Sequence, residues 1–89
     1  MEVPKSSENL SHAVEGHLAL YFRALGDDEP VSGLHGRILA EVERPLILAT
    51  LRHTSGNQIK AAAILGVNRN TLRKKIRELN ISTNRADYR

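Results

Sequence analysis

Apolar residues recur with a helical period along most of this 89-residue chain, and no segment alternates in the way that a strand requires. The first helix is predicted from about Ser11, whose side chain suits an N-cap, to Leu25. Its apolar stripe consists of Val14, Leu18, Tyr21, Phe22 and Leu25. The polar residues 1–9 before it are expected to be a flexible lead-in or the end of a linker.

A second helix is predicted from about Leu34 to about Thr54, with Pro45 inside it. Proline removes one backbone hydrogen bond and kinks a helix. We expect one kinked helix, because the apolar stripe continues across the proline without a change of phase. The alternative is a pair of shorter helices that meet at Arg44 and Pro45.

The middle of the second helix, residues 46–51, is apolar nearly all round. Such a helix must be buried on more than one side. In so short a chain the additional cover is expected from a second copy, so residues 10–55 are interpreted as the dimerisation helices of a homodimer. The expected dimer core consists of Val14, Leu18, Tyr21, Phe22, Leu39, Val42, Leu46, Leu48 and Ala49.

Residues 56–81 are predicted to form two short helices, from about 58 to 65 and from about 68 to 79 or 80. Gly66 supplies the backbone freedom for the turn between them. This layout is that of a helix-turn-helix, whose second helix enters the major groove of DNA. The whole chain is therefore predicted to be all-α with four helices.

Small side chains at residues 61–63, all alanine, suit the close helix crossing of such a motif. Ile59, Leu65 and Val67 are the expected anchors in the core. Residues 82–89 show no apolar period and are expected to be a flexible tail.

Charge is distributed unevenly along the chain. Residues 1–51 contain four Lys/Arg against eight Asp/Glu, whereas residues 52–89 contain nine against two, for a net charge of +3. This asymmetry favours an acidic or neutral scaffold and a basic half that faces a polyanion. The alternative is a solvated face that is rich in lysine and arginine.

The last predicted helix carries its cations opposite its apolar stripe. Leu72, Ile76 and Leu79 lie on one face, and at about 100° per residue the opposite face carries Asn70, Lys74 and Arg77. Arginine, lysine, amide and hydroxyl groups bind base edges and phosphates. The residues expected to enter the groove are Asn70, Thr71, Arg73 and Lys74; those expected at the phosphates are Arg69, Lys75, Asn57 and Lys60. Asn68 and Thr71 have an alternative role as caps of this helix.

Other functional classes find little support in the composition. Hydrophobic residues make up 40% of the chain and aromatic residues only 3%, so the core must consist of Leu, Ile, Val and Ala. Cysteine is absent, which excludes disulfides and thiolate metal sites.

No apolar run approaches the roughly 18 residues of a membrane span. The N-terminus lacks the apolar region of a signal peptide. The four histidines are too scattered to suggest a zinc site. We expect no enzyme, cofactor, metal or membrane partner, and a cytoplasmic location.

The run from Gly56 to Leu79 resembles the C-terminal DNA-binding domain of the nitrogen regulators of the NtrC family. It is also similar to the nucleoid protein Fis, which shares that fold. The segment Asn68-Arg-Asn-Thr-Leu-Arg-Lys-Lys75 is the specific part of the resemblance, which covers about residues 10 to 81 and includes a proline at position 45. Ile59 departs from Fis, which has a hydroxyl residue there, and favours the nitrogen regulators. Residues 11–17 and the Gly-Asp-Asp-x-Pro loop look like those of alphaproteobacterial members.

The resemblance implies an intertwined dimer core built from the first two helices of two subunits, with the two fourth helices in successive major grooves of double-stranded DNA at a two-fold-symmetric site. The family's contact positions match Asn57, Asn68, Arg69, Thr71, Arg73, Lys74 and Lys75. It also implies a two-component response regulator that binds enhancers and activates sigma-54-dependent nitrogen-assimilation genes. Its receiver and ATPase domains, and so its contact with sigma-54 RNA polymerase, lie outside this chain, which lacks a phosphate-binding loop.

Two further alternatives remain open at this point. A stand-alone Fis-like nucleoid-associated protein that bends DNA would have the same fold. A pure dimerisation module would explain the first two helices but would leave the basic face of the fourth unused.

Overall fold

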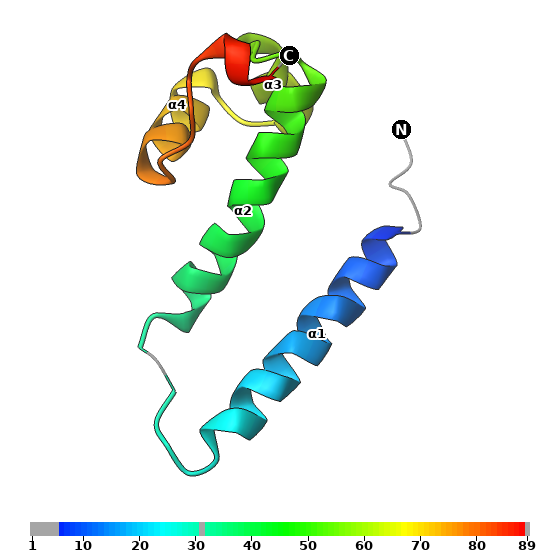
Figure 1. Ribbon diagram of the computed structural model, residues 1–89, viewed down its shortest axis with the longest axis vertical. Helices are drawn as coiled ribbons and strands as arrows, with labels where there is room; N and C mark the ends of the chain where they lie inside the picture. Colours follow the sequence, from blue (N-terminus) through cyan, green and yellow to red (C-terminus); the bar gives the residue numbers. More distant parts are fainter. Residues whose placement is uncertain (1–5, 31, 89) are drawn as a thin grey trace. The chain divides into compact units, whose positions relative to one another are not determined.

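The computed structural model describes residues 6–30 and 32–88, and the chain divides into two compact units, residues 1–34 and 35–89. Every regular element in these described residues is helical, which confirms the all-α class (Figure 1). None of the described helices is long and apolar enough to cross a membrane.

The first unit consists mainly of helix α1, Ser6–Leu25. It begins five residues earlier than the pattern predicted, and the rest of the expected lead-in, residues 1–5, lies outside the described residues. The helix ends where Gly26 takes a φ of +61°, a conformation that favours glycine. The rings of Tyr21 and Phe22 make an edge-to-face contact, with centroids 5.2 Å apart.

Helix α2 spans Leu34–His53 and contains Pro45 in its interior. The chain therefore forms one helix here, as predicted, and the alternative of two helices is excluded. Its C-terminal half buries Ile47, Thr50 and Leu51. The hydroxyl of Thr50 is satisfied inside the helix, because it donates a hydrogen bond of 2.8 Å to the carbonyl of Leu46.

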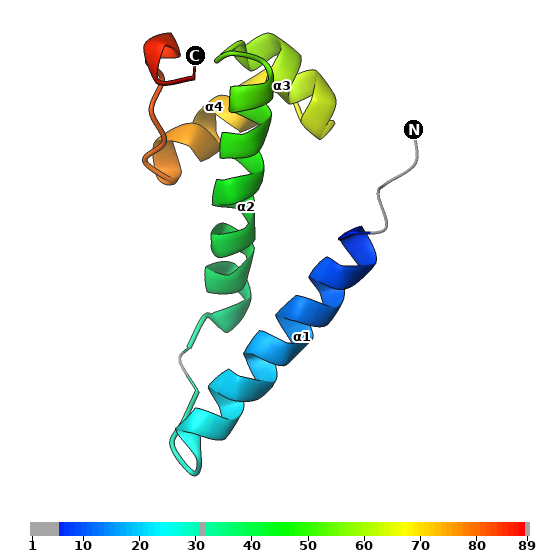
Figure 2. The ribbon, with the colours of Figure 1, turned by 45° about the vertical axis from the view of Figure 1, so that its right-hand side comes forward.

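Helices α3, Gln58–Leu65, and α4, Arg69–Glu78, form the predicted helix-turn-helix, packed against the end of α2 (Figure 2). Gly66 ends α3 with a φ of 74°, and its N–H donates to the carbonyl of Ala62 over 2.9 Å. A left-handed residue at this position suits glycine, because glycine has no Cβ to clash with the backbone. The two observed helices agree with the predicted bounds to within a residue or two.

The core of the second unit joins all of its elements. Ala61 and Ala62 are buried where α3 crosses its neighbours, as their small side chains predicted. Leu65 packs at the edge of this core, but Ile59 and Val67 are 62% and 41% exposed, so the prediction that they anchor it is wrong. Ile59 lies about 160° around the helix from Ala61, and thus on the side away from the core. The buried residues are Ile47, Leu51, Ala61, Ala62, Leu72, Ile76, Ile81 and Tyr88.

The C-terminal residues differ from the expected flexible tail. After α4 the chain turns back and forms a 3-10 helix, η1, at Arg85–Tyr88. Tyr88 is only 6% exposed, and its phenol donates a hydrogen bond of 2.6 Å to the carbonyl of Ser82. A single aromatic side chain, that of Tyr88, supplies the apolar area that packs the 3-10 helix onto the core. The segment therefore has no apolar period from which its order could be predicted. Arg89 lies outside the described residues.

Candidate nucleic-acid interface

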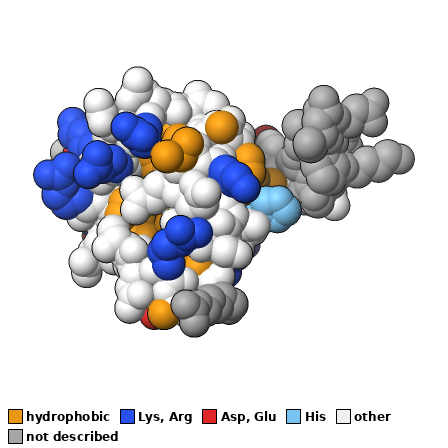
Figure 3. Space-filling view, turned by 90° about the horizontal axis from the view of Figure 1, so that it is seen from above, with side chains coloured by type: hydrophobic (Ala, Val, Ile, Leu, Met, Phe, Trp, Pro, Cys, Tyr) orange, Lys and Arg blue, Asp and Glu red, His pale blue; other side chains and the backbone are white. Residues whose placement is uncertain are grey.

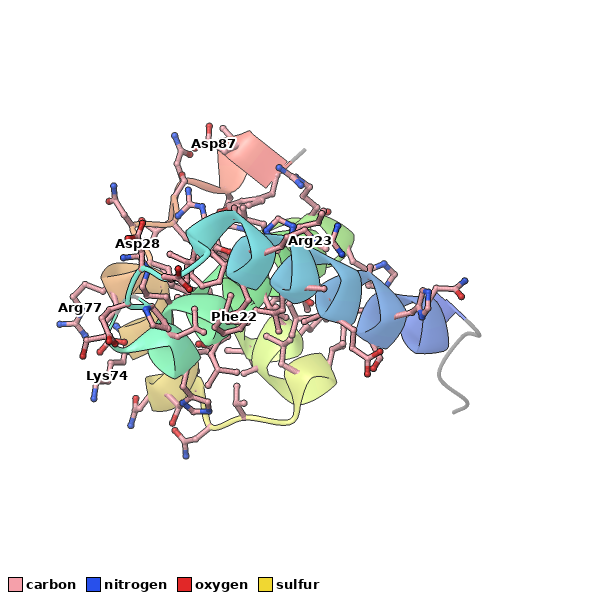
Figure 4. All side chains as sticks on the ribbon, turned by 90° about the horizontal axis from the view of Figure 1, so that it is seen from below. Phe22, Arg23, Asp28, Lys74, Arg77 and Asp87 are labelled. Atoms are coloured by element: carbon pink, nitrogen blue, oxygen red, sulfur yellow. The ribbon has the colours of Figure 1, made fainter. Side chains whose placement is uncertain are left out.

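Helix α4 has one buried and one exposed face. Leu72 and Ile76 are 1% and 3% exposed, and Leu79 packs at the edge of the same core. The opposite side is exposed and carries Arg69, Asn70, Thr71, Arg73, Lys74 and Arg77. In the stick view Lys74 and Arg77 project outward from the helix (Figure 4). Burying one stripe therefore fixes which side chains α4 presents to a partner.

Asn68 begins α4 as its N-cap, with its Oδ1 accepting a hydrogen bond of 2.8 Å from the Asn70 N–H. The capping alternative is thus correct for Asn68. The side chain also remains exposed. Thr71, the other candidate cap, lies inside α4 and is exposed, so it is free to serve the outer face.

The entrance to α3 is built in the same way. Asn57 is the N-cap, and its Oδ1 accepts a 3.1 Å hydrogen bond from the N–H of Lys60. The hydroxyl of Thr54 donates to the carbonyl of Asn57 over 3.1 Å and fixes the approach from α2. Lys60 is exposed and Asn57 is half-buried. Both are therefore held at a helix N-terminus, where backbone N–H groups favour anions.

Both lysines in α4 have intramolecular partners. Lys75 is half-buried, and its Nζ lies 3.2 Å from Oε1 of Glu43 in α2. Lys74 is exposed, and its Nζ lies 3.9 Å from Oε1 of Glu78, one turn further along the helix. An exposed pair at this distance is weak and gives way to a phosphate readily. Lys75 is the more firmly held of the two.

A contact that the sequence did not reveal also fixes the position of α4. The guanidinium of Arg44 in α2 donates a hydrogen bond to the carbonyl of Leu79, the C-cap of α4. Together with the Lys75–Glu43 pair it joins the C-terminal half of α4 to α2. No pattern could have predicted this, because the partner is a backbone carbonyl 35 residues away.

Positive charge gathers on the side of the second unit where α4 lies, as the space-filling view shows (Figure 3). The surface there is a mixture of guanidinium, ammonium, amide and hydroxyl groups on a rigid helix. This mixture binds phosphate oxygens and base edges. Within the described residues, no cluster of three or more His, Cys, Asp or Glu could hold a metal ion.

The residues expected in the dimer core are unevenly covered. Phe22, Leu39, Val42 and Leu46 are 45%, 47%, 37% and 52% exposed. Leu48 differs from the others, because it packs against the core of its own unit. The remaining members are Val14, Leu18 and Tyr21, which are half-buried, and Ala49, which is exposed.

Comparison with known proteins identifies the motif. The family model described as "Bacterial regulatory protein, Fis family" matches residues 38–79. The DNA-binding transcriptional regulator NtrC of Rhizobium meliloti (strain 1021) is 60% identical over 80 residues, which is 90% of this chain and 16% of that protein. NtrC of Azospirillum brasilense is 64% identical over 74 residues, 83% of this chain and 15% of that protein. A putative Fis-like DNA-binding protein of Neisseria meningitidis (strain Z2491) is 39% identical over 83% of this chain and 92% of its own length.

The fold, the basic face and these matches define a DNA-binding helix-turn-helix domain. The chain belongs to the Fis family of bacterial regulatory proteins, and its NtrC relatives are mostly alphaproteobacterial. It spans about one sixth of the length of those NtrC relatives.

Proposed function

We propose that this chain is the DNA-binding and dimerisation domain of an NtrC-type response regulator that binds enhancer sites and activates sigma-54-dependent nitrogen-assimilation genes. The observation that carries the proposal is the exposed face of α4, where cations and an amide lie opposite the buried Leu72 and Ile76. Identity of 52–64% to three NtrC proteins supports the regulator role. Such a regulator acts in the cytoplasm, and its contact with the sigma-54 polymerase is made by domains other than this one.

In this proposal the N-terminal half of α4 reads bases. Asn70, Thr71, Arg73 and Lys74 are exposed there, and recognition helices contact base edges with their first turns. Phosphate contacts flank them, from Arg69 and Arg77 on α4 and from Asn57 and Lys60 at the start of α3. Asn68 both caps α4 and contacts DNA. Lys75 joins the phosphate contacts only when it leaves Glu43.

A second copy completes the proposed reader. Leu39, Val42 and Leu46 lie on one stripe of α2 at i, i+3 and i+7, and all three are exposed in the single chain. An apolar stripe of this kind on a helix is stable only when it is covered. Two-fold pairing through α1 and α2 would cover it and would present two copies of α4 to half-sites one helical turn apart.

A stand-alone Fis-like nucleoid-associated protein is the second candidate. It is favoured by the match to the Neisseria protein, of which this chain covers 92%. A protein of that kind binds most sequences by charge and deformability, whereas an enhancer binder needs a large preference for its own site. Exposed Ile59, which offers no hydroxyl to a phosphate, favours the regulator.

Protection mapping on duplex DNA, combined with Lys74→Ala, tests the proposal. The parent should protect two half-sites about 10 base pairs apart and bind that symmetric site at least about 1,000-fold more tightly than random duplex. Lys74→Ala should weaken binding, whereas Arg37→Ala, an exposed cation at the start of α2, should leave it unchanged. Equal affinity for both duplexes would favour the nucleoid protein, and unchanged binding by Lys74→Ala would reject α4 as the reader.

A further inference from the structure

An open groove of about 680 Å³ lies beside the reading face of α4, within the second unit. Its walls are mostly polar: Gln58 at the start of α3, Arg73 and Arg77 of α4, and Asn80 and Thr83 after it. The two cations that line it, Arg73 and Arg77, are also expected DNA contacts. The groove is therefore continuous with the surface of α4 that faces DNA, and it runs from there to the entrance of α3.

The C-terminal segment, residues 81–88, contributes Ile81 and Thr83 to the lining of this groove and is fixed in place. Ile81 and Tyr88 are buried in the core. At the far end, a Cβ built on Gly56 would lie 3.2 Å from Cγ of Arg85 and 3.3 Å from the ring of Tyr88, so η1 packs directly on the backbone between α2 and α3. Ser82 also donates a hydrogen bond to the carboxylate of Asp87.

Packing against Gly56 places a cation at the start of α3. The Nε of Arg85 donates a hydrogen bond to the carbonyl of Ser55 over 3.3 Å, two residues before the N-cap Asn57. Within the described residues the guanidinium of Arg85 makes this one hydrogen bond. Its other N–H donors therefore remain for a ligand. Arg85 is exposed. Its place beside Ser55 and Gly56, before the entrance of α3, is set by the fold.

The chemistry of the groove fits one ligand class. Guanidinium, hydroxyl and amide groups along an open channel bind the oxygens of a sugar-phosphate backbone. Asp87, the acidic residue of the segment, is held by Ser82 and lies well apart from Lys74 and Arg77 (Figure 4). An extended strand of phosphates suits this open, mostly polar channel of about 680 Å³ better than a compact anion does.

We propose that residues 81–88 extend the DNA interface, with Thr83 and Arg85 binding the phosphate backbone that flanks the half-site read by α4. The inference rests on the proposed DNA-binding role of α4, but it adds contacts that belong to neither helix of the motif. Because these contacts are to phosphates, they raise affinity for all duplexes alike and leave the preference for one sequence unchanged.

Salt-dependent binding of the whole chain to a symmetric site and to random duplex tests this proposal. Arg85→Gln keeps the aliphatic stem but removes the charge. It should weaken both complexes about three- to tenfold and should reduce the slope of log affinity against log salt by about 0.9. Thr83→Val should weaken both about two- to tenfold, because one hydrogen bond is lost. Arg37→Gln, which removes the same charge from α2, should change neither quantity.

Two comparisons separate the possible failures. If Lys74→Ala weakens binding and Arg85→Gln leaves affinity and salt slope at the parent values, the groove contact is wrong and the role of α4 stands. If neither variant changes binding, both proposals fall. If Arg85→Gln unfolds, Arg85→Lys and Thr83→Val replace it. A contact between Arg85 and phosphate predicts that Arg85→Lys keeps the salt slope of the parent. If the segment is purely structural, Thr83→Val should bind DNA with the affinity of the parent, which would contradict the proposal.

Discussion

Lys75 and Glu43 form an ion pair, with Nζ and Oε1 3.2 Å apart, that joins α4, the proposed recognition helix, to α2. Both side chains are about one-third exposed, at 38% and 35%, so solvent screens the attraction. Pairs of this kind stabilise a fold by about 0–1 kcal/mol. Its larger consequence is for binding, because Lys75 can reach a phosphate only by leaving Glu43.

Glu43→Gln should therefore strengthen DNA binding while costing little stability. Removing the carboxylate frees Lys75 and deletes a negative charge beside the interface, so affinity should rise about two- to fivefold and the salt slope should steepen. The free energy of unfolding should fall by less than about 1 kcal/mol. Glu41→Gln, which removes an exposed charge two residues earlier on α2, is the matched control for net charge. Equal affinities of the two variants would show that Lys75 does not compete between Glu43 and DNA.

Gly56→Ala should destabilise the second unit. Gly56 has a φ of +82°, and a Cβ there would meet Arg85 and Tyr88 at 3.2–3.3 Å, so the new side chain is strained and also pushes η1 away. We expect a loss of about 2–3 kcal/mol in chemical denaturation. Gly66→Ala is the control, because its φ is +74° with nothing within 4 Å, and it should cost only the backbone term of about 1–2 kcal/mol. Equal losses would mean that the contact with η1 contributes nothing.

The features of this fold that can be predicted from the sequence are those that interactions between neighbouring residues determine. The bounds of α3 and α4 follow from Asn57, Gly66 and Asn68, because caps and glycine turns act within three or four residues. Burial of Leu72 and Ile76 follows from helical spacing alone. The exposed face of α4 was therefore predictable, residue by residue.

The rest depends on contacts between distant residues. The hydrogen bond from Arg44 to the Leu79 carbonyl and the Lys75–Glu43 pair have sequence separations of 35 and 32. The docking of Tyr88 depends on the absence of a side chain at Gly56. Ile59 in α3 and Val67 in the turn after it misled the prediction, because a single apolar residue can be exposed at small cost. No period of three to four residues encodes any of these relationships.

Asn68 should show separable effects on stability and on binding. Its side chain caps α4 through a 2.8 Å hydrogen bond to the Asn70 N–H, so Asn68→Ala should cost about 1 kcal/mol of unfolding free energy. Asn68→Asp keeps the acceptor and should retain that stability. In the proposed complex its negative charge would face the phosphates, so it should weaken DNA binding at least about tenfold. Asn68→Ser, a neutral cap, is the control. Parent-like DNA affinity of Asn68→Asp would place this residue outside the interface.

Tyr88 predicts a loss of stability at alkaline pH. Burial raises the pKa of its phenol above the ordinary value, and the nearby Asp87 adds to that rise, while Arg52 and Arg44 oppose it. Between the unfolded and the folded pKa the unfolded chain loses the proton that the folded chain keeps, so stability is full below pH of about 10 and falls above it. Denaturation from pH 8 to 11 should show a steeper decline for the parent than for Tyr88→Phe. Tyr21 is present in both proteins, so their difference isolates Tyr88, and parallel profiles would contradict the burial of its phenol.

The exposed apolar stripe of α2 predicts that the folded protein is a dimer. Leu39 is 47% exposed, so Leu39→Glu places a charge where a single subunit tolerates it but where a two-fold interface would bury it unpaired. The parent should sediment as a dimer at micromolar concentration and melt at a temperature that rises with concentration. Leu39→Glu should sediment as a monomer or lose its fold, whereas Ile64→Glu, a substitution at a 58% exposed site on α3, should remain dimeric. A folded monomeric parent would reject the dimer, and it would leave the spacing of half-sites on DNA without a structural basis.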